Sequence, residues 1–76
     1  MTPKLPVISG QELIRALSKF GYAQVRQKGS HVRLRDLSDA HRKSITIPLH
    51  PSIAFGTLKQ ILRDARITVD QLLAKL

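Results

Sequence analysis

The residues best suited to chemistry in this sequence form the short segment Lys28-Gly29-Ser30-His31. The imidazole of His31 can take up or release a proton near neutral pH, because the reference pKa of histidine is about 6.5. Gly29 allows the backbone to come close to a phosphate, and the amides of a turn can donate hydrogen bonds to it. Lys28 adds a positive charge and Ser30 adds a hydroxyl. The segment is therefore a candidate for a turn that binds a phosphodiester, with His31 as the catalytic residue. The alternative is that His31 is structural or simply exposed, as a lone histidine at the start of a strand more often is.

RNA cleavage is a reaction that so few groups can perform. The 2′-hydroxyl of the substrate is itself the nucleophile, so no metal ion is needed to generate one. A base must remove the proton of this hydroxyl, an acid must protonate the leaving 5′ oxygen, and positive groups must stabilise the phosphorane dianion. His31 is the candidate for one proton-transfer role, and the other could belong to His50, Ser30, Lys28 or a water molecule.

The composition favours a polyanionic partner. Thirteen Lys and Arg against five Asp and Glu give a net charge of +8, and such a field attracts nucleic acid, anionic lipid or an acidic protein. Binding to lipid would need an amphipathic helix with a face rich in lysine and arginine, and the sequence predicts none. A merely solvated basic surface is the simplest alternative. Arg26 and Arg33, which flank the turn, are further candidates for binding phosphate.

The sequence gives little support for disulfides, metal sites or cofactor sites. The chain has no cysteine, which excludes disulfides and thiolate metal sites and suits a reducing cytosol. Its first ten residues lack the apolar region of a signal peptide, so we expect a cytoplasmic protein. Three scattered histidines without paired carboxylates do not predict a metal site, and we expect no cofactor. We expect His41 to be exposed in a charged loop.

The elements that must position the turn can be read from the spacing of apolar residues. Seventy-six residues suffice for one domain, over residues 1–76. An extended lead-in is expected over 1–8, because Pro3 and Pro6 disfavour helix. Ser9 and Glu12 form a capping box for a helix over 10–20. Residues 22–28 then alternate, which predicts a strand with Ala23 and Val25 toward the core and with outward Tyr22, Gln24, Arg26 and Lys28.

Two further strands and two helices follow. Val32 and Leu34 point inward from a strand over 31–35, and a polar loop spans 36–41. Ile45, Ile47 and Leu49 share one side of a third strand, which Pro48 and Pro51 close. Thr57 is expected to cap a helix that runs to Ala65, and Thr68 with Gln71 forms a second capping box.

The expected fold is α+β with the order α-β-β-β-α-α. Because the strands carry apolar residues on one face only, the helices should cover that face of a three-stranded antiparallel sheet and leave the other open. The open face would carry outward side chains that are mostly basic, namely Arg26, Lys28, Arg33, Arg35, Ser44 and Thr46.

The sequence resembles the HicA (YcfA-like) mRNA interferase toxins over nearly its whole length. The most specific matching segments are Arg26-Gln27-Lys28-Gly29-Ser30-His31 and Gly56-Thr57-Leu58; Leu5-Pro6, Ser9-Gly10, Phe20-Gly21-Tyr22 and Ile47-Pro48-Leu49-His50 match as well. Departures from the family pattern are Val7, where a basic residue is common, Ala54-Phe55 before Gly56, and Arg66 in place of a frequent glycine.

The resemblance implies more than the composition could. It implies a fold of the double-stranded-RNA-binding-domain type, a functional histidine at His31 with Gly29 and Ser30 completing the motif, and mRNA cleavage without a metal cofactor. It also implies that a cognate HicB antitoxin masks the active surface, as in a type II toxin–antitoxin system.

Three hypotheses follow. The first is an endoribonuclease toxin in which Lys28, Arg26 and Arg33 bind phosphate and His31 transfers protons. The second is a non-catalytic RNA-binding module, which the same fold and charge would suit. The third is an interaction protein whose basic face meets only an acidic partner.

Overall fold

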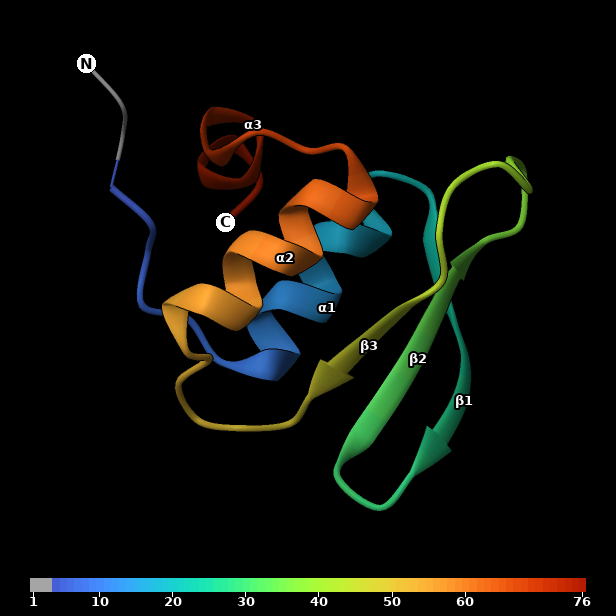
Figure 1. The fold of residues 1–76 in the computed structure, drawn as a ribbon, viewed down its shortest axis with the longest axis horizontal. Helices are drawn as coiled ribbons and strands as arrows, with labels where there is room; N and C mark the ends of the chain where they lie inside the picture. The colour runs from blue at the N-terminus through green and yellow to red at the C-terminus, as the bar shows by residue number, and fades with distance from the viewer. Residues whose placement is uncertain (1–3) are drawn as a thin grey trace.

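The elements follow one another in the order that the sequence predicts (Figure 1). A computed structural model describes residues 4–76, so the first three residues of the expected lead-in lie outside the described part of the chain. The elements are α1 (Gly10–Ser18), β1 (Tyr22–Lys28), β2 (His31–Asp36), β3 (Ile45–Pro48), α2 (Phe55–Ala65) and α3 (Val69–Ala74). The strands form one antiparallel sheet in the order β1-β2-β3. The predicted α+β fold is confirmed.

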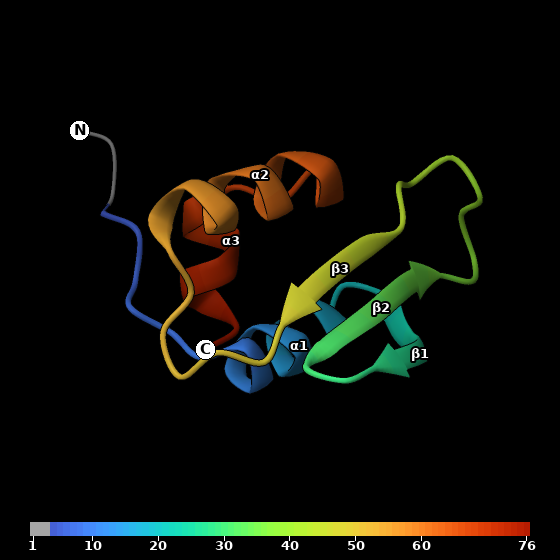
Figure 2. The same ribbon diagram turned by 60° about the horizontal axis from the view of Figure 1, so that its bottom comes forward.

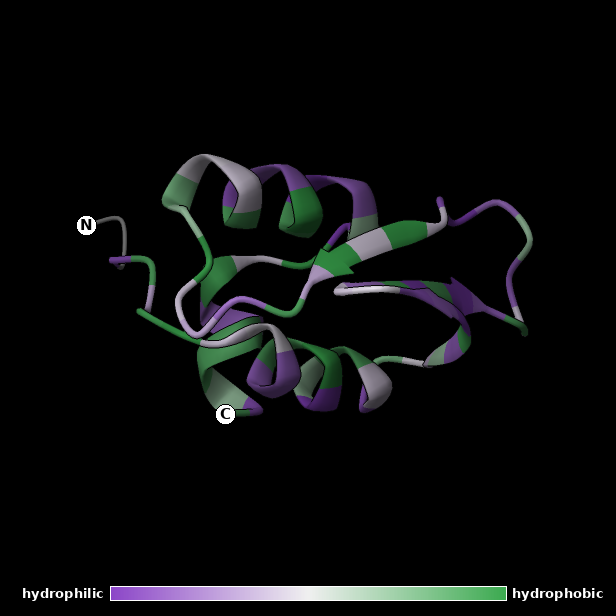
Figure 3. Cartoon of the chain, turned by 90° about the horizontal axis from the view of Figure 1, so that it is seen from below, coloured by the Kyte–Doolittle hydropathy of each residue, from purple (hydrophilic) through white to green (hydrophobic). Residues whose placement is uncertain are grey.

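The helices lie on one side of the sheet and leave its other side uncovered (Figures 1 and 2). α1 packs against β1 and β3, and α2 packs against β3. Buried and exposed residues alternate in β2 and β3, and Figure 3 shows the matching alternation of hydrophobic and more hydrophilic residues along β3. The core contains apolar side chains from every element, among them Leu13, Leu17, Val32, Leu34, Ile45, Ile47, Leu58, Ile61 and Leu72. The outer face of the sheet is therefore free to bind a partner.

The predicted alternation of β1 is wrong in its first half. The pairing of β1 with β2 shifts between Gln24 and Arg26, so Val25 is the extra residue of a β-bulge and is 43% exposed. Before the bulge the faces are reversed: Ala23 pairs with Arg35 on the outer face, and Tyr22 is buried. The Tyr22 hydroxyl donates to the carbonyl of Lys43 at 3.1 Å. Beyond the bulge, β1 presents its basic residues outward as predicted.

Two capping boxes are confirmed, whereas the predicted cap of α2 is wrong. The hydroxyls of Ser9 and Thr68 accept from the backbone three residues on, at the starts of α1 and α3. α1 ends at Ser18, two residues before the predicted end. α2 begins at Phe55 with Ala54 at the N-cap and no side-chain cap, so Thr57 lies inside the helix.

The loop between β2 and β3 is held down by a partly buried ion pair. Asp36, which the sequence placed in a polar loop, is buried at the end of β2, and Arg42 binds it at 2.8 Å. The same guanidinium donates to the carbonyl of Phe20 at 2.7 Å and to that of Ala65 at 2.8 Å. Hydrogen bonds from Ser38 and Arg42 lower the pKa of Asp36 to about 2. Arg42 thereby ties the loop to the ends of α1 and α2.

Candidate active site on the open face of the sheet

The segment 28–31 forms the tight turn between β1 and β2. Lys28 and His31 are cross-strand partners, and the two residues between them make the turn. Gly29 has φ 58°, whereas Ser30 has no positive φ, which is the pattern of a type II′ hairpin. A Cβ added at position 29 would meet no atom within 4 Å beyond its two neighbours in the chain. Glycine is thus required here by the backbone conformation, and the turn is open to an approaching ligand.

The outer face of the sheet brings the predicted site residues into two neighbouring rows. One row contains Lys28, His31 and Pro48, and the next contains Arg26, Arg33 and Thr46. Directly opposite residues of an antiparallel pair have Cβ atoms about 5 Å apart, and successive residues on one face of a strand lie about 7 Å apart. All of these residues except Pro48 line a shallow depression of about 270 Å³. We call its lining residues, Arg26, Lys28, His31, Arg33 and Thr46, the cationic face.

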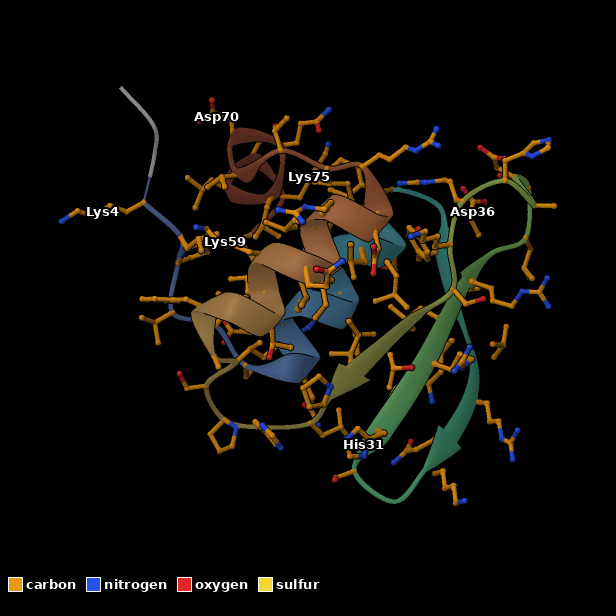
Figure 4. The ribbon with its side chains drawn as sticks, viewed as in Figure 1. Lys4, His31, Asp36, Lys59, Asp70 and Lys75 are labelled. Atoms are coloured by element: carbon orange, nitrogen blue, oxygen red, sulfur yellow. The ribbon has the colours of Figure 1, made fainter. Side chains whose placement is uncertain are left out.

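His31 is exposed at the hairpin end of the sheet, where Figure 4 shows it. Gly29 and Ser30 lie beside it in the turn. The carbonyl of Ser30 accepts a hydrogen bond from the amide of Leu49 at 2.7 Å. This bond anchors the turn to the segment after β3 and thus fixes the start of β2, on which His31 stands. A phosphodiester on the cationic face would meet the imidazole directly.

The cationic face has no carboxylate of its own. The acidic residues are Glu12 on α1, Asp36 on the inner face, Asp39 in the loop, Asp64 on α2 and Asp70 on α3. Within residues 4–76, the ion pairs join Arg42 to Asp36 and Lys43 to Asp64, so Arg26, Lys28 and Arg33 are left without one. Three clustered cations repel one another, and an anion bound between them would relieve this repulsion.

The other histidines occupy different places. His50 lies two residues beyond Pro48, the cross-strand partner of His31, and its carbonyl accepts from the amide of Gly10 at 3.0 Å. Its side chain is exposed but does not line the depression around His31. His41 is exposed in the β2–β3 loop, as predicted. Thr46 was predicted only as an outward residue of the third strand. The register places its hydroxyl-bearing side chain opposite Arg33, and sequence spacing alone could not show this.

Within residues 4–76, no group of three or more His, Cys, Asp and Glu side chains lies close enough together to hold a metal ion. None of the helices in this part of the chain has the length and apolar character needed to cross a membrane.

Comparison with known proteins gives one finding. A family model described as the HicA toxin of bacterial toxin–antitoxin systems matches residues 10–67, which include the hairpin turn, the whole sheet and α2. No curated protein matches the chain.

Proposed function

Because the chain belongs to the HicA toxin family of bacterial toxin–antitoxin systems, we propose that it is an endoribonuclease that cleaves mRNA without a metal ion. The observation that carries the proposal is an exposed imidazole directly opposite a lysine, on a sheet face whose cations have no acidic partners in the described part of the chain. An RNA strand supplies both the anion that this face needs and the nucleophile that the reaction needs.

In the proposed reaction, His31 transfers protons at the scissile phosphodiester. Removal of the proton from the 2′-hydroxyl lets its oxygen attack the adjacent phosphorus, and the bond from phosphorus to the 5′ oxygen breaks as that oxygen is protonated. The products are a 2′,3′-cyclic phosphate and a 5′-hydroxyl. The neutral imidazole of His31 can take the first proton, and the imidazolium can give the second.

Lys28, Arg26 and Arg33 would stabilise the charge that develops on the phosphorane. Lys28 stands opposite His31, so its ammonium group can reach the non-bridging oxygens of a phosphate that the imidazole contacts. Arg26 and Arg33 form the next row and would hold the neighbouring phosphate through their guanidinium groups. Gly29 and Ser30 shape the turn. The remaining proton-transfer group is Lys28, Ser30, His50 or water.

A toxin of this kind pairs with an antitoxin. We propose a HicB-type antitoxin that covers the cationic face with an acidic surface, because such a surface would neutralise the unpaired cations and exclude RNA together. An mRNA substrate would place the activity in the cytoplasm.

The test is cleavage of RNA by the purified chain in the presence of EDTA, compared with the His31→Ala variant. We expect the variant to lose about 10²–10⁴ in cleavage rate, the usual contribution of one acid–base group, while RNA affinity stays within a few-fold. Intact RNA with the native chain would instead favour a non-catalytic RNA-binding module. Full cleavage by the His31→Ala variant would remove His31 from the reaction.

A further inference from the structure

A second group of basic side chains lies at the end of the sheet opposite the hairpin. His41 and Lys43 come from the loop before β3, Arg63 from the last turn of α2, and Arg66 directly follows that helix. All of these residues are exposed, and together with Gln60 and Asp64 they line a concavity of about 280 Å³. We call His41, Lys43, Arg63 and Arg66 the loop–helix cluster.

The fold assembles this cluster through Arg42. Its guanidinium binds Asp36 in β2 and the carbonyl of Ala65 at the end of α2, both at 2.8 Å, so its two neighbours along the chain are held beside the end of α2. Arg66 has φ 58°, a left-handed conformation that costs a residue with a side chain about 1–2 kcal/mol. The chain therefore carries an arginine where a glycine would suit the backbone better.

The loop–helix cluster has a surplus of positive charge. Lys43 contacts Asp64 at 3.7 Å, and Gln60 donates to the same Asp64 oxygen at 3.0 Å. In the described part of the chain, Arg63 and Arg66 take part in no ion pair. Two guanidinium groups are thus available to an anion, because Asp64, which lines the same concavity, is already bound by Lys43 and Gln60.

The cluster is continuous with the cationic face. A groove of about 510 Å³ runs between β3 and α2, and it shares Thr46 with the depression around His31. At its other end the groove shares Gln60 and Asp64 with the concavity of the loop–helix cluster. Lys43 precedes Pro48, the cross-strand partner of His31, by five positions, which corresponds to about 17 Å of extended chain.

We propose that the loop–helix cluster is a second binding site for the substrate, which holds the sugar-phosphate backbone of single-stranded RNA several nucleotides from the phosphate that is cleaved. The strand would leave the cationic face at Thr46, follow the groove between β3 and α2, and contact Arg63 and Arg66. This inference rests on the proposed RNA substrate. The guanidinium groups of Arg63 and Arg66 suit an RNA backbone, because guanidinium groups bind phosphate oxygens through two parallel hydrogen bonds.

The experiment measures binding separately from cleavage. Single-stranded 2′-O-methyl oligonucleotides of about three and about ten nucleotides lack the free 2′-hydroxyl and stay intact, so fluorescence anisotropy reports affinity alone. The test variant is Arg63→Gln with Arg66→Gln. The matched control is Lys4→Gln with Lys59→Gln, which removes the same charge from exposed positions away from His31 (Figure 4).

We expect the Arg63/Arg66 variant to bind the longer oligonucleotide about 5–30-fold more weakly, the worth of two exposed charge contacts, and the shorter one as the native chain does. The Lys4/Lys59 variant should stay within about twofold on both. Equal losses in the two variants would reduce the effect to net charge and overturn the proposal. So would unchanged RNA affinity with weakened antitoxin binding, which would assign the cluster to the partner protein. A separate cleavage assay tests the endoribonuclease proposal itself. That proposal fails if the native chain leaves an unmodified RNA of about ten nucleotides intact.

Discussion

Salt should weaken RNA binding at the cationic face with a slope set by Arg26, Lys28 and Arg33. Each cation that neutralises a phosphate of a single strand contributes about −0.7 to the slope of log affinity against log salt concentration. Three unpaired cations line the depression, so a short oligonucleotide confined to this face should show a slope of about −2.1. Its Kd should then rise about 20-fold between about 50 and 200 mM salt.

The variant Arg26→Gln removes one of these cations and should reduce the slope to about −1.4, so that the same change in salt raises Kd only about 7-fold. Fluorescence anisotropy with a 2′-O-methyl oligonucleotide of about four nucleotides, which carries about three phosphodiesters, measures the slope without cleavage. The control is Lys4→Gln, which changes the net charge equally at an exposed position far from His31 (Figure 4). A native slope shallower than about −1, or the same slope in both variants, would refute the view that this face binds RNA through unpaired cations.

Three predictions concern stability. The pKa of Asp36 is lowered to about 2 from 3.8, so this carboxylate should stabilise the fold above about pH 4 and lose that contribution as the pH falls toward 2; urea unfolding across this range should show a shallower pH dependence for Asp36→Asn. Arg66→Gly should stabilise the chain by about 0.5–1 kcal/mol, since relief of the left-handed backbone outweighs the greater freedom of unfolded glycine. The control for Arg66→Gly is Arg63→Gly in the last turn of α2, which should destabilise the chain by about 1 kcal/mol. A higher free energy of unfolding for this control would contradict the reasoning. Gly29→Ala should cost about 1–2 kcal/mol through its positive φ alone, and a calorimetric midpoint equal to that of the native chain would disprove a strained turn.

The sequence alone was sufficient for the order of the elements and for naming most of the residues that the structure groups around His31. Capping boxes depend on residues three apart, and the alternation in β2 and β3 depends on residues two apart, so both are local patterns that survive folding. The position of His31 next to a glycine-containing turn is equally local. The matched family model agrees with the resemblance found in these motifs.

Tertiary structure decided which side chains of β1 face the core and which face outward. A β-bulge arises where two residues of one strand face a single residue of the partner, so the place of Val25 depends on β2 and not on its own neighbours. Tyr22 is buried for the same reason, since its pairing with Asp36 places it on the inner face of the sheet. Simple alternation could not have indicated either outcome.

By itself, then, the sequence determined the excess of basic residues, the two capping boxes, the hairpin turn, and the outward direction of His31 and Arg33 in β2; the outward direction of Arg26 and Lys28 depends on the bulge in β1. Only the tertiary structure decided which of these side chains stand opposite one another, and that Arg42 draws the β2–β3 loop to the end of α2. The physical reason is that local backbone preferences act over a few residues, whereas strand register and loop anchoring depend on contacts between residues far apart in the chain.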